Sequence, residues 1–497
     1  MSYRVQSMSA PPNEHSAWLT RSASEMARAL RAGEVSSLEL VELHIARIKA
    51  VNPVLNAVVA ERYELARQEA RAADEALAAA GDEEALSPLL GVPCSIKECF
   101  ALEGMPQASG LVKRKDIRAT SDATTVARLR QAGAIPVGVT NTSELCMWME
   151  SANRLYGRTS NPYDPTRIVG GSSGGEGAIV GAGGTPFGLG SDIGGSIRMP
   201  AFFNGVFGHK PSGGLVPGTG QYPMAENEAR RFLSTGPIAR RAEDLMPIVR
   251  LLAGPDGIDT GAEEMELGDP ATVSLDGMKV LSIDGNGLRN VSADLLDAQS
   301  RAASALAARG AVVTHDRIPA FKRSLDLWSK LMSAAEETPF ASLLGQGDPI
   351  PILWEHLKWF VGRSAHTLPA IGLANIERLP LVQDKNPGRL FDEVRALREE
   401  IAERIGPDGV LLYPSYTRTA PRHGRPLLTP IDWVYTAIFN VLELPVTQVP
   451  LGLDAAGLPL GVQVAGCHGR DHVTIAAAVA LEEALGGWVP PWTVGCP

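Results

Sequence analysis

Two serines in separate glycine-rich turns indicate acyl transfer by a serine nucleophile. Ser172 lies in the segment GGSSGG, and Ser196 follows 24 residues later in the segment DIGGSIR. Glycine allows the backbone to adopt positive φ and to approach a ligand closely, so that amide N–H groups can face a developing oxyanion. The stretch from Gly170 to Ala201 contains no histidine. Serine chemistry without a histidine base is therefore the first hypothesis.

The same stretch, GGSSGGEGAIVGAGGTPFGLGSDIGGSIRMPA, resembles the signature of the amidase signature family of serine hydrolases. The resemblance implies a Ser–Ser–Lys triad, in which Ser196 is the nucleophile, Ser172 the bridging serine and an upstream lysine the base. It also implies a cis peptide bond between Gly171 and Ser172. The implied fold is α/β, with a large, mixed, twisted central sheet covered on both faces by helices in a single compact catalytic domain.

The upstream lysine is assigned to Lys97, because the apolar run LGVPCSIK predicts a buried strand that ends at this residue. Lysine acts as a base near neutral pH only where burial or a neighbouring cation depresses its pKa. Most lysines at strand ends are solvated, but the family resemblance favours the catalytic interpretation. Lys210, in the segment GHKP, is the competitor, and it resembles a family landmark of the scaffold beyond the nucleophile.

The hypothetical mechanism uses these groups in turn. Ser172 takes the proton of Ser196 and passes it toward the lysine, while Ser196 attacks the carbonyl carbon of an amide or ester. Ser172 then returns a proton to the leaving amine, and water hydrolyses the acyl-enzyme by the same relay. The predicted oxyanion hole consists of the backbone N–H groups of Ile193, Gly194 and Gly195, and loss of one such donor typically costs about 2.7–4 kcal/mol in the barrier.

The segment GGSSG also fits G-x-S-x-G, the nucleophile elbow of α/β-hydrolases, which would make Ser172 the nucleophile of an esterase. An elbow needs a strand directly before the serine, and a downstream acid and histidine. The proline-rich segment NPYDPTR precedes it instead, with only Ile168 and Val169 as a short strand. None of the downstream histidines His315, His423, His468 and His472 lies in a diagnostic context. The amidase interpretation is therefore preferred.

Composition and motif spacing argue against several classes of partner and cofactor. The 497 residues carry 46 Lys and Arg against 56 Asp and Glu, a net charge of −10, which disfavours nucleic acids and other polyanions. Cys94 and Cys99 have no second pair at metal-binding spacing, and there is no Walker phosphate loop, so we expect neither a metal nor a cofactor. Five cysteines without a disulfide framework favour a cytoplasmic location.

Local patterns divide the chain into a tail and one catalytic domain. Residues 1–15 are polar, which predicts a flexible tail and no signal peptide, and no apolar run is long enough to span a bilayer. Residues 16–85 predict a helical preface, with an S-x-x-E capping box at Ser36 and an alanine-rich helix over 62–80. Residues 86–255 form the signature core and 409–490 a C-terminal sheet with helices. Their alternation of strands and helices favours an α/β layer.

Residues 321–385 depart from this alternation and predict two amphipathic helices. The first covers 324–337, and the second opens at Asp348-Pro349. The apolar face of the second contains Leu353, Trp354, Leu357 and Phe360. These helices could line an acyl channel or form a membrane-facing cap, and ordinary packing on the core is the alternative.

A finer resemblance, to the fatty-acid amide hydrolase branch, covers nearly the whole chain after residue 16. It is carried by IKECF, SELCMW, MPAFFNG and GHKPS, and by Glu98, where many amidases have Asp. It implies small-molecule substrates, namely fatty-acid or N-acyl amides, with aryl amides, esters and carbamates (urethanes) left open, and a pocket bordered by Cys146 and Met147. The alternative is a glutamine-hydrolysing amidotransferase A-type subunit, which usually shows Lys-Asp and a Leu-Lys-Pro-Thr tail. A homodimer and peripheral membrane contact are further partner predictions.

Overall fold

Eleven strands form one mixed sheet through the centre of the described residues, in the order β1-β3-β2-β6-β8-β7-β12-β13-β11-β9-β10. The structure is a computed structural model that describes residues 14–79, 86–384 and 386–494. The strands are β1 (Val58–Glu61), β2 (Pro93–Lys97), β3 (Ile135–Thr140), β6 (Phe187–Asp192), β7 (Phe207–Lys210), β8 (Ser234–Ala239), β9 (Lys279–Ser282), β10 (Val312–His315), β11 (Val410–Pro414), β12 (Val446–Leu453) and β13 (Pro459–Ala465). A separate hairpin joins β4 (Ala152–Asn153) to β5 (Gly157–Arg158).

Parallel pairing at β2 positions the functional residues. β2 runs parallel to both β3 and β6, and Ile96 on β2 lies opposite Leu189 on β6. Because parallel neighbours end at the same edge of a sheet, Lys97 at the end of β2 meets the last residues of β6. The other strands around the middle of the sheet, from β6 to β11, pair antiparallel. The mixed sheet implied by the family resemblance is confirmed.

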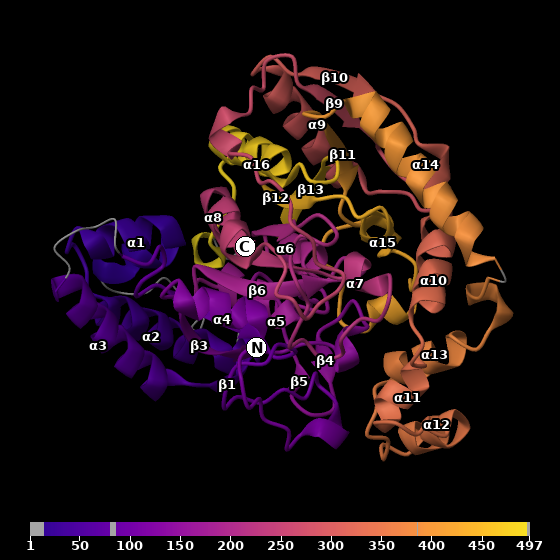
Figure 1. The fold of residues 1–497 in the computed structure, drawn as a ribbon, viewed down its shortest axis with the longest axis horizontal. Helices are drawn as coiled ribbons and strands as arrows, with labels where there is room; N and C mark the ends of the chain where they lie inside the picture. Colours follow the sequence, from indigo (N-terminus) through magenta and orange to yellow (C-terminus); the bar gives the residue numbers. More distant parts are fainter. Residues whose placement is uncertain (1–13, 80–85, 385, 495–497) are drawn as a thin grey trace.

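Helices cover both faces of the sheet (Figure 1). Residues of β3 show this: Ile135 and Val137 belong to one apolar cluster, and Val139, which follows a shift in the register of β3 with β2, belongs to another. The first cluster includes residues of α2, α3 and α5, and the second includes residues of α1, α8, α9 and α16. The helices on these faces are α1 (Ala23–Arg31), α2 (Ser37–Leu55), α3 (Tyr63–Ala79), α4 (Thr124–Gln131), α5 (Gly174–Gly181), α6 (Arg198–Phe203), α7 (Ala229–Phe232), α8 (Leu245–Leu252), α9 (Ala293–Ala307), α14 (Pro387–Ile405), α15 (Val434–Val441) and α16 (Asp471–Leu485).

The N-terminal helices follow their capping signals. The expected box at Ser36 is present, since its side chain accepts from the Glu39 N–H and the Glu39 carboxylate accepts from the Ser36 N–H. A second box joins Ser22 to Glu25 ahead of α1. The predicted tail, 1–15, falls largely outside the described residues, which begin in the 3₁₀ helix Glu14–Thr20. No helix among the described residues is long and apolar enough to cross a membrane.

The region 321–385 contains α10 (Ser324–Ala335), α11 (Phe340–Gly345), α12 (Ile352–Phe360) and α13 (Leu368–Ile376). α10 packs against α14 and α15 and so belongs to the core. The second predicted helix begins at Ile352, not at Asp348-Pro349, because Pro351 disfavours helical backbone at the residue before it. The apolar face expected for it points outward, with Leu353 and Phe360 each 78% exposed.

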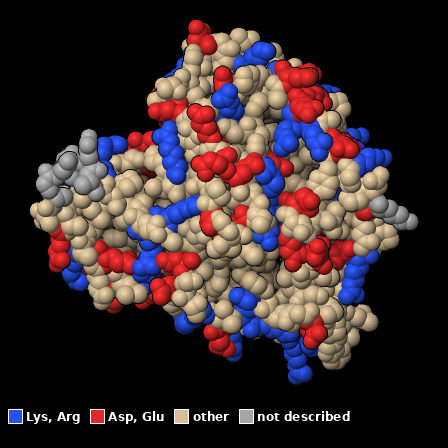
Figure 2. Space-filling model, viewed as in Figure 1, with Lys and Arg blue, Asp and Glu red and all other residues tan. Residues whose placement is uncertain are grey.

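Charges are interspersed over the face drawn in Figure 2, with no large area of one sign. The lobe at the lower right, where Figure 1 places α12, is mostly without charged side chains. The exposed apolar residues of this segment are Leu353, Trp354, Leu357, Phe360 and Val361, named here the α12 patch. Ile352, at the start of α12, belongs instead to a small apolar cluster with residues of α11 and α13 and with Leu111 and Leu145.

Candidate active site

Lys97, the last residue of β2, is completely buried and contacts two serine hydroxyls. Its Nζ donates to Ser172 Oγ at 2.7 Å and to Ser191 Oγ at 2.9 Å. The predicted base and the predicted bridging serine are thus in direct contact, although 75 residues separate them in the chain. A buried ammonium or amine needs hydrogen-bond partners, and these two hydroxyls provide them.

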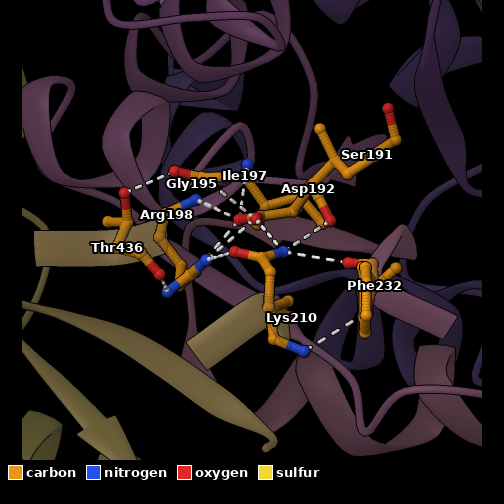
Figure 3. Close-up of polar contacts among 12 residues, drawn as sticks. Ser191, Asp192, Gly195, Ile197, Arg198, Lys210, Phe232 and Thr436 are labelled. Carbon is orange, nitrogen blue, oxygen red and sulfur yellow. Dashed lines mark hydrogen bonds and ion pairs between the residues drawn. The ribbon is translucent and has the colours of Figure 1, made fainter. Parts of the chain in front are cut away.

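Ser191 is a site residue that the sequence analysis missed. It lies next to the end of β6, one residue before Asp192. Successive side chains of a strand point to opposite faces, and in Figure 3 the Ser191 hydroxyl points away from the Asp192 carboxylate. The signal that could have found it is the parallel pairing of β2 with β6, since that pairing brings the end of β6 beside Lys97.

The turn around Ser172 is tightly enclosed. The peptide bond between Gly171 and Ser172 is cis, as the resemblance implied. A Cβ added at Gly171 would lie 2.2 Å from the carbonyl oxygen of Trp148, so only glycine fits there. The Ser151 hydroxyl donates to the Ser172 carbonyl at 2.9 Å and accepts from the Gly174 N–H at 2.9 Å. Packing and hydrogen bonds therefore hold the Ser172 side chain toward Lys97.

The loop that carries Ser196 is closed by a buried ion pair. Asp192 Oδ1 and Arg198 Nη2 are 2.9 Å apart, and both side chains have no exposed surface. Burial raises the pKa of Asp192, but the charge and hydrogen bonds of Arg198 outweigh it and hold that pKa well below its usual range. The same carboxylate accepts from the Ile197 N–H at 3.0 Å. Figure 3 shows these contacts converging on Asp192.

Arg198 ties the loop to the C-terminal half of the chain. Its guanidinium donates to the Thr436 carbonyl at 2.8 Å, to Gln463 Oε1 at 2.8 Å and to Asn440 Oδ1 at 2.6 Å. Asn440 in turn donates to the Asp192 carbonyl at 2.9 Å. The guanidinium therefore has its donors satisfied, as a buried arginine requires.

The peptide planes of the loop decide which amides are free for an oxyanion. The carbonyls of Ile193 and Gly194 accept from Trp328 Nε1 at 2.8 Å and from Thr436 Oγ1 at 2.6 Å. In a trans peptide the N–H points opposite to the C=O, so the Gly194 N–H is directed away from Trp328. No hydrogen bond of the described residues occupies the N–H groups of Ile193, Gly194 or Ser196.

Gly195 differs from the predicted oxyanion set in this structure. Its N–H donates to Asp192 Oδ1 at 2.7 Å, because the carboxylate closes a turn over the three following residues. The backbone at Gly195 has φ +123°, and an added Cβ would lie 2.1 Å from Thr436 Oγ1. Gly195 thus shapes the loop, and the amides of Ile193 and Gly194 are left available.

Ser172, Ser191 and Ser196 line one cavity of about 530 Å³ together with Cys146 and Met147. The predicted pocket residues are thus beside the predicted nucleophile. Among the described residues no hydrogen bond joins the hydroxyls of Ser172 and Ser196. Catalytic hydrogen bonds often form only when substrate is bound. The remaining wall is largely apolar and includes Met224, Leu233, Trp328, Met332, Phe340, Leu343, Leu373 and Ile376.

Lys210, the competitor of Lys97, lies away from the serines. It is fully buried and donates to the Pro211 carbonyl at 2.8 Å and to Ser234 Oγ at 3.3 Å. Burial, followed by the charge of Arg198, lowers the pKa of Lys210 to about 7. Its position behind the nucleophile loop agrees with a scaffold role (Figure 3).

The nucleophile elbow lacks its required neighbours. The residues directly before Gly170 form no strand, and no histidine of the described residues lines the cavity. Instead His423 pairs with Glu150 at 2.6 Å and His366 with Glu144 at 2.7 Å, outside the serine cluster. The geometry therefore favours lysine over histidine as the base.

Comparisons with known proteins show which sequences and structures the chain is similar to. The sequence model of the family described as Amidase matches residues 39–475. Fatty-acid amide hydrolase 2-A of Danio rerio is 47% identical over 489 residues, covering 95% of this chain and 90% of the relative. The acylamidase of Rhodococcus erythropolis is 32% identical, over 96% of this chain and 96% of the relative. A solved bacterial aryl acylamidase has a TM-score of 0.78 at 25% identity, over 96% of this chain and 99% of that one.

Proposed function

The chain belongs to the amidase family, hydrolases of carbon–nitrogen bonds other than peptide bonds, and we propose that it hydrolyses amides through an acyl-enzyme on Ser196. The buried contact of 2.7 Å between Lys97 Nζ and Ser172 Oγ, beside a cavity that also contains Ser196, carries this proposal. It supplies a base and a proton relay at the nucleophile without histidine.

In the proposed reaction the substrate carbonyl lies over Ser196. Ser172 accepts the proton of the Ser196 hydroxyl while passing its own to Lys97, and the new bond from Ser196 Oγ to carbon gives a tetrahedral oxyanion. The amides of Ile193 and Gly194 stabilise that charge. As the carbon–nitrogen bond breaks, the proton returns through Ser172 to the leaving amine. Water then attacks the acyl-enzyme with the same relay and releases the acid.

The substrates we propose are amides with long apolar acyl groups. The largely apolar wall of the cavity supports this class, because burial of apolar surface contributes roughly 25 cal/mol per Å². The relative from Danio rerio, named a fatty-acid amide hydrolase, agrees with it. Aryl amides, esters and carbamates present a similar carbonyl group to Ser196 and are included as further substrate classes. A cytoplasmic location and a homodimer stay predictions from the sequence.

The test combines active-site labelling with turnover. A fluorophosphonate should label Ser196, and Ser196→Ala should abolish both labelling and hydrolysis of long-chain anilides. Lys97→Ala and Ser172→Ala should lower the labelling rate by at least a hundredfold, whereas Lys115→Ala, at an exposed lysine, should label normally. Labelling of Ser196→Ala, or normal rates in Lys97→Ala, would contradict the proposal. Ammonia release from glutamine in preference to long-chain amides would support the amidotransferase alternative instead.

We also propose that the α12 patch contacts a lipid surface. Its side chains are 51–78% exposed, and α12 contacts α13, whose Leu373 and Ile376 line the cavity. In this proposal a lipid-bound amide passes from the α12 patch beside α13 into the cavity. Leu353→Ser with Phe360→Ser should abolish flotation with phosphatidylcholine vesicles while turnover of a water-soluble anilide persists. Equal flotation of this double variant and the native protein would refute the contact.

A further inference from the structure

One face of α10 runs along the cavity wall and joins the reaction centre to a carboxyl group. The cavity-lining residues of this segment are Trp328, Ser329, Met332, Ser333 and Glu336, a spacing that places them on one side of a helix. Trp328 marks the inner end, because its Nε1–H donates to the Ile193 carbonyl at 2.8 Å. Glu336 follows eight residues later, so at 1.5 Å per residue it lies about 12 Å along the helix axis.

Glu336 is half-buried at the outer end of this wall and has no ion-pair partner among the described residues. Burial, followed by the negative charge of Glu226, raises the pKa of Glu336 to about 7, and the backbone N–H of Glu226 opposes this rise. The Glu226 carboxylate is itself engaged, since it accepts from the N–H groups of Glu337 and Thr338 at 2.7 and 2.9 Å.

The other charged groups at this end of the cavity are arranged differently. Glu377 accepts from the N–H groups of Phe340 and Ala341 at 2.6 and 3.1 Å. Glu337 is exposed and accepts from Asn227 Nδ2 at 3.2 Å, and Arg378 is exposed to solvent. Glu336 and Glu377 are both partly buried and have no ion-pair partner among the described residues, but two backbone N–H groups occupy the Glu377 carboxylate, and Glu336 is the one whose pKa is raised.

Partial burial disfavours the charged form of a carboxyl that has no cation beside it, and a cationic ligand would favour that form. A substrate bound at Ser196 and extended along α10 would bring its distal end to this carboxyl. An ammonium group there would form a charge-assisted hydrogen bond, and the apolar spacer would contact Met332 on the same helix face. A terminal methyl group would leave the Glu336 carboxyl without a cation.

We infer that Glu336 is a specificity residue for substrates with a distal ammonium group, which would meet it about 12 Å along the axis of α10 from Trp328. The class is amides of ω-amino acids or of monoacylated diamines with a long apolar spacer. The inference rests on the proposed function, because it assumes that amides are hydrolysed at Ser196. It adds that a cation at the far end of the cavity is selected over an equally long neutral chain.

The experiment compares length-matched substrates. One series has p-nitroanilides of ω-aminoalkanoic acids from hexanoyl to dodecanoyl, each beside the methyl-terminated acyl chain of equal length. The second has N-acetylated diamines beside N-alkyl acetamides, which places the cation on the amine side. In at least one series the ratio of kcat/KM for the ammonium-bearing substrate to kcat/KM for its neutral partner should be highest at one chain length. Glu336→Gln should lower that ratio by about tenfold or more, the range of a hydrogen bond to a charged group.

Two variants serve as controls. Glu399→Gln removes an exposed carboxylate on α14 and should keep the native ratio. Glu337→Gln removes a neighbouring charge and should lower the ratio far less than Glu336→Gln. An unchanged ratio in Glu336→Gln in both series, or an equal loss in Glu337→Gln, overturns the inference.

Binding separates this inference from the proposed function. Calorimetry with decylammonium and decanol measures the preference for a cation without any turnover, and Glu336→Gln should reduce it by about tenfold. If no amide is hydrolysed, the proposed function fails while the binding result still decides the role of Glu336. If neutral amides are hydrolysed but neither assay detects a preference that depends on Glu336, only this inference fails.

Discussion

Replacement of Asp192 by asparagine tests whether the ion pair with Arg198 holds the nucleophile loop. Asparagine keeps the size of the side chain and one acceptor oxygen but removes the negative charge. In the native protein the carboxylate accepts from the Gly195 and Ile197 amides and from Nε and Nη2 of Arg198. The variant leaves the guanidinium of Arg198 buried without a counter-ion.

The expected loss of stability is about 3–5 kcal/mol, the range found when one partner of a buried ion pair is removed. The upper part of that range applies because both side chains are 0% exposed, so water cannot replace the lost charge. The pKa of Asp192 lies below its usual range, so its stabilising contribution is present above the pKa of an unfolded aspartate and is lost as the pH falls. The difference between native protein and variant should therefore shrink in acid.

Urea unfolding followed by tryptophan fluorescence measures this loss as a lower midpoint. Asp432→Asn is the matched control, because the Asp432 side chain is also 0% exposed but its partners Arg289 and Arg418 are 36% and 41% exposed. Solvent can stabilise the charges of those arginines, so we expect Asp432→Asn to lower the free energy of unfolding by about 1 kcal/mol. A loss below about 1 kcal/mol in Asp192→Asn, or equal losses in the two variants, would refute the reasoning.

Three further predictions follow from the site. Ser191→Ala removes one of the two acceptors of Lys97 and should slow fluorophosphonate labelling about tenfold; a native labelling rate would show that Ser191 does not help to position Lys97. Gly195→Ala should abolish activity through the contact of 2.1 Å with Thr436, whereas Gly194→Ala, whose Cβ would lie 3.1 Å from its nearest neighbour, should retain part of it in the same anilide assay. Burial raises the pKa of Glu176 to about 7 despite hydrogen bonds from Ser95 and Thr140, so its protonated form stabilises the fold below the unfolded pKa and that stability is lost as pH rises to about 7. Glu176→Gln should therefore gain thermal stability relative to the native protein as the pH rises from about 4.5 to about 7, and a constant difference would contradict this.

The sequence predicted the parts of the site that depend on local pattern. The strand that ends at Lys97 and the glycine turn before Ser172 each depend on a short run of consecutive residues. Both are present in the structure. Ser191 and the direction of the Gly195 amide were missed because they depend on contacts distant in sequence. Ser191 meets Lys97 through strand pairing, and Thr436 fixes the loop from 242 residues away.

The outward face of α12 also could not be predicted from the sequence. Its periodic apolar residues predicted an amphipathic helix correctly, but periodicity reports only that a face is apolar. Whether that face meets the core depends on where the preceding turns direct the helix. Here Ile352 and Glu355 are buried, while Leu353 and Phe360 project away from the molecule.

The anchoring of Arg198 has a consequence for the protein during its synthesis. Its acceptors Thr436, Asn440 and Gln463 emerge from the ribosome 238 to 265 residues after it. A nascent chain that already contains Lys97, Ser172 and Ser196 therefore lacks the contacts that shape the nucleophile loop. We therefore expect hydrolytic competence only after translation has passed Gln463, and chains that end before this residue should be inert.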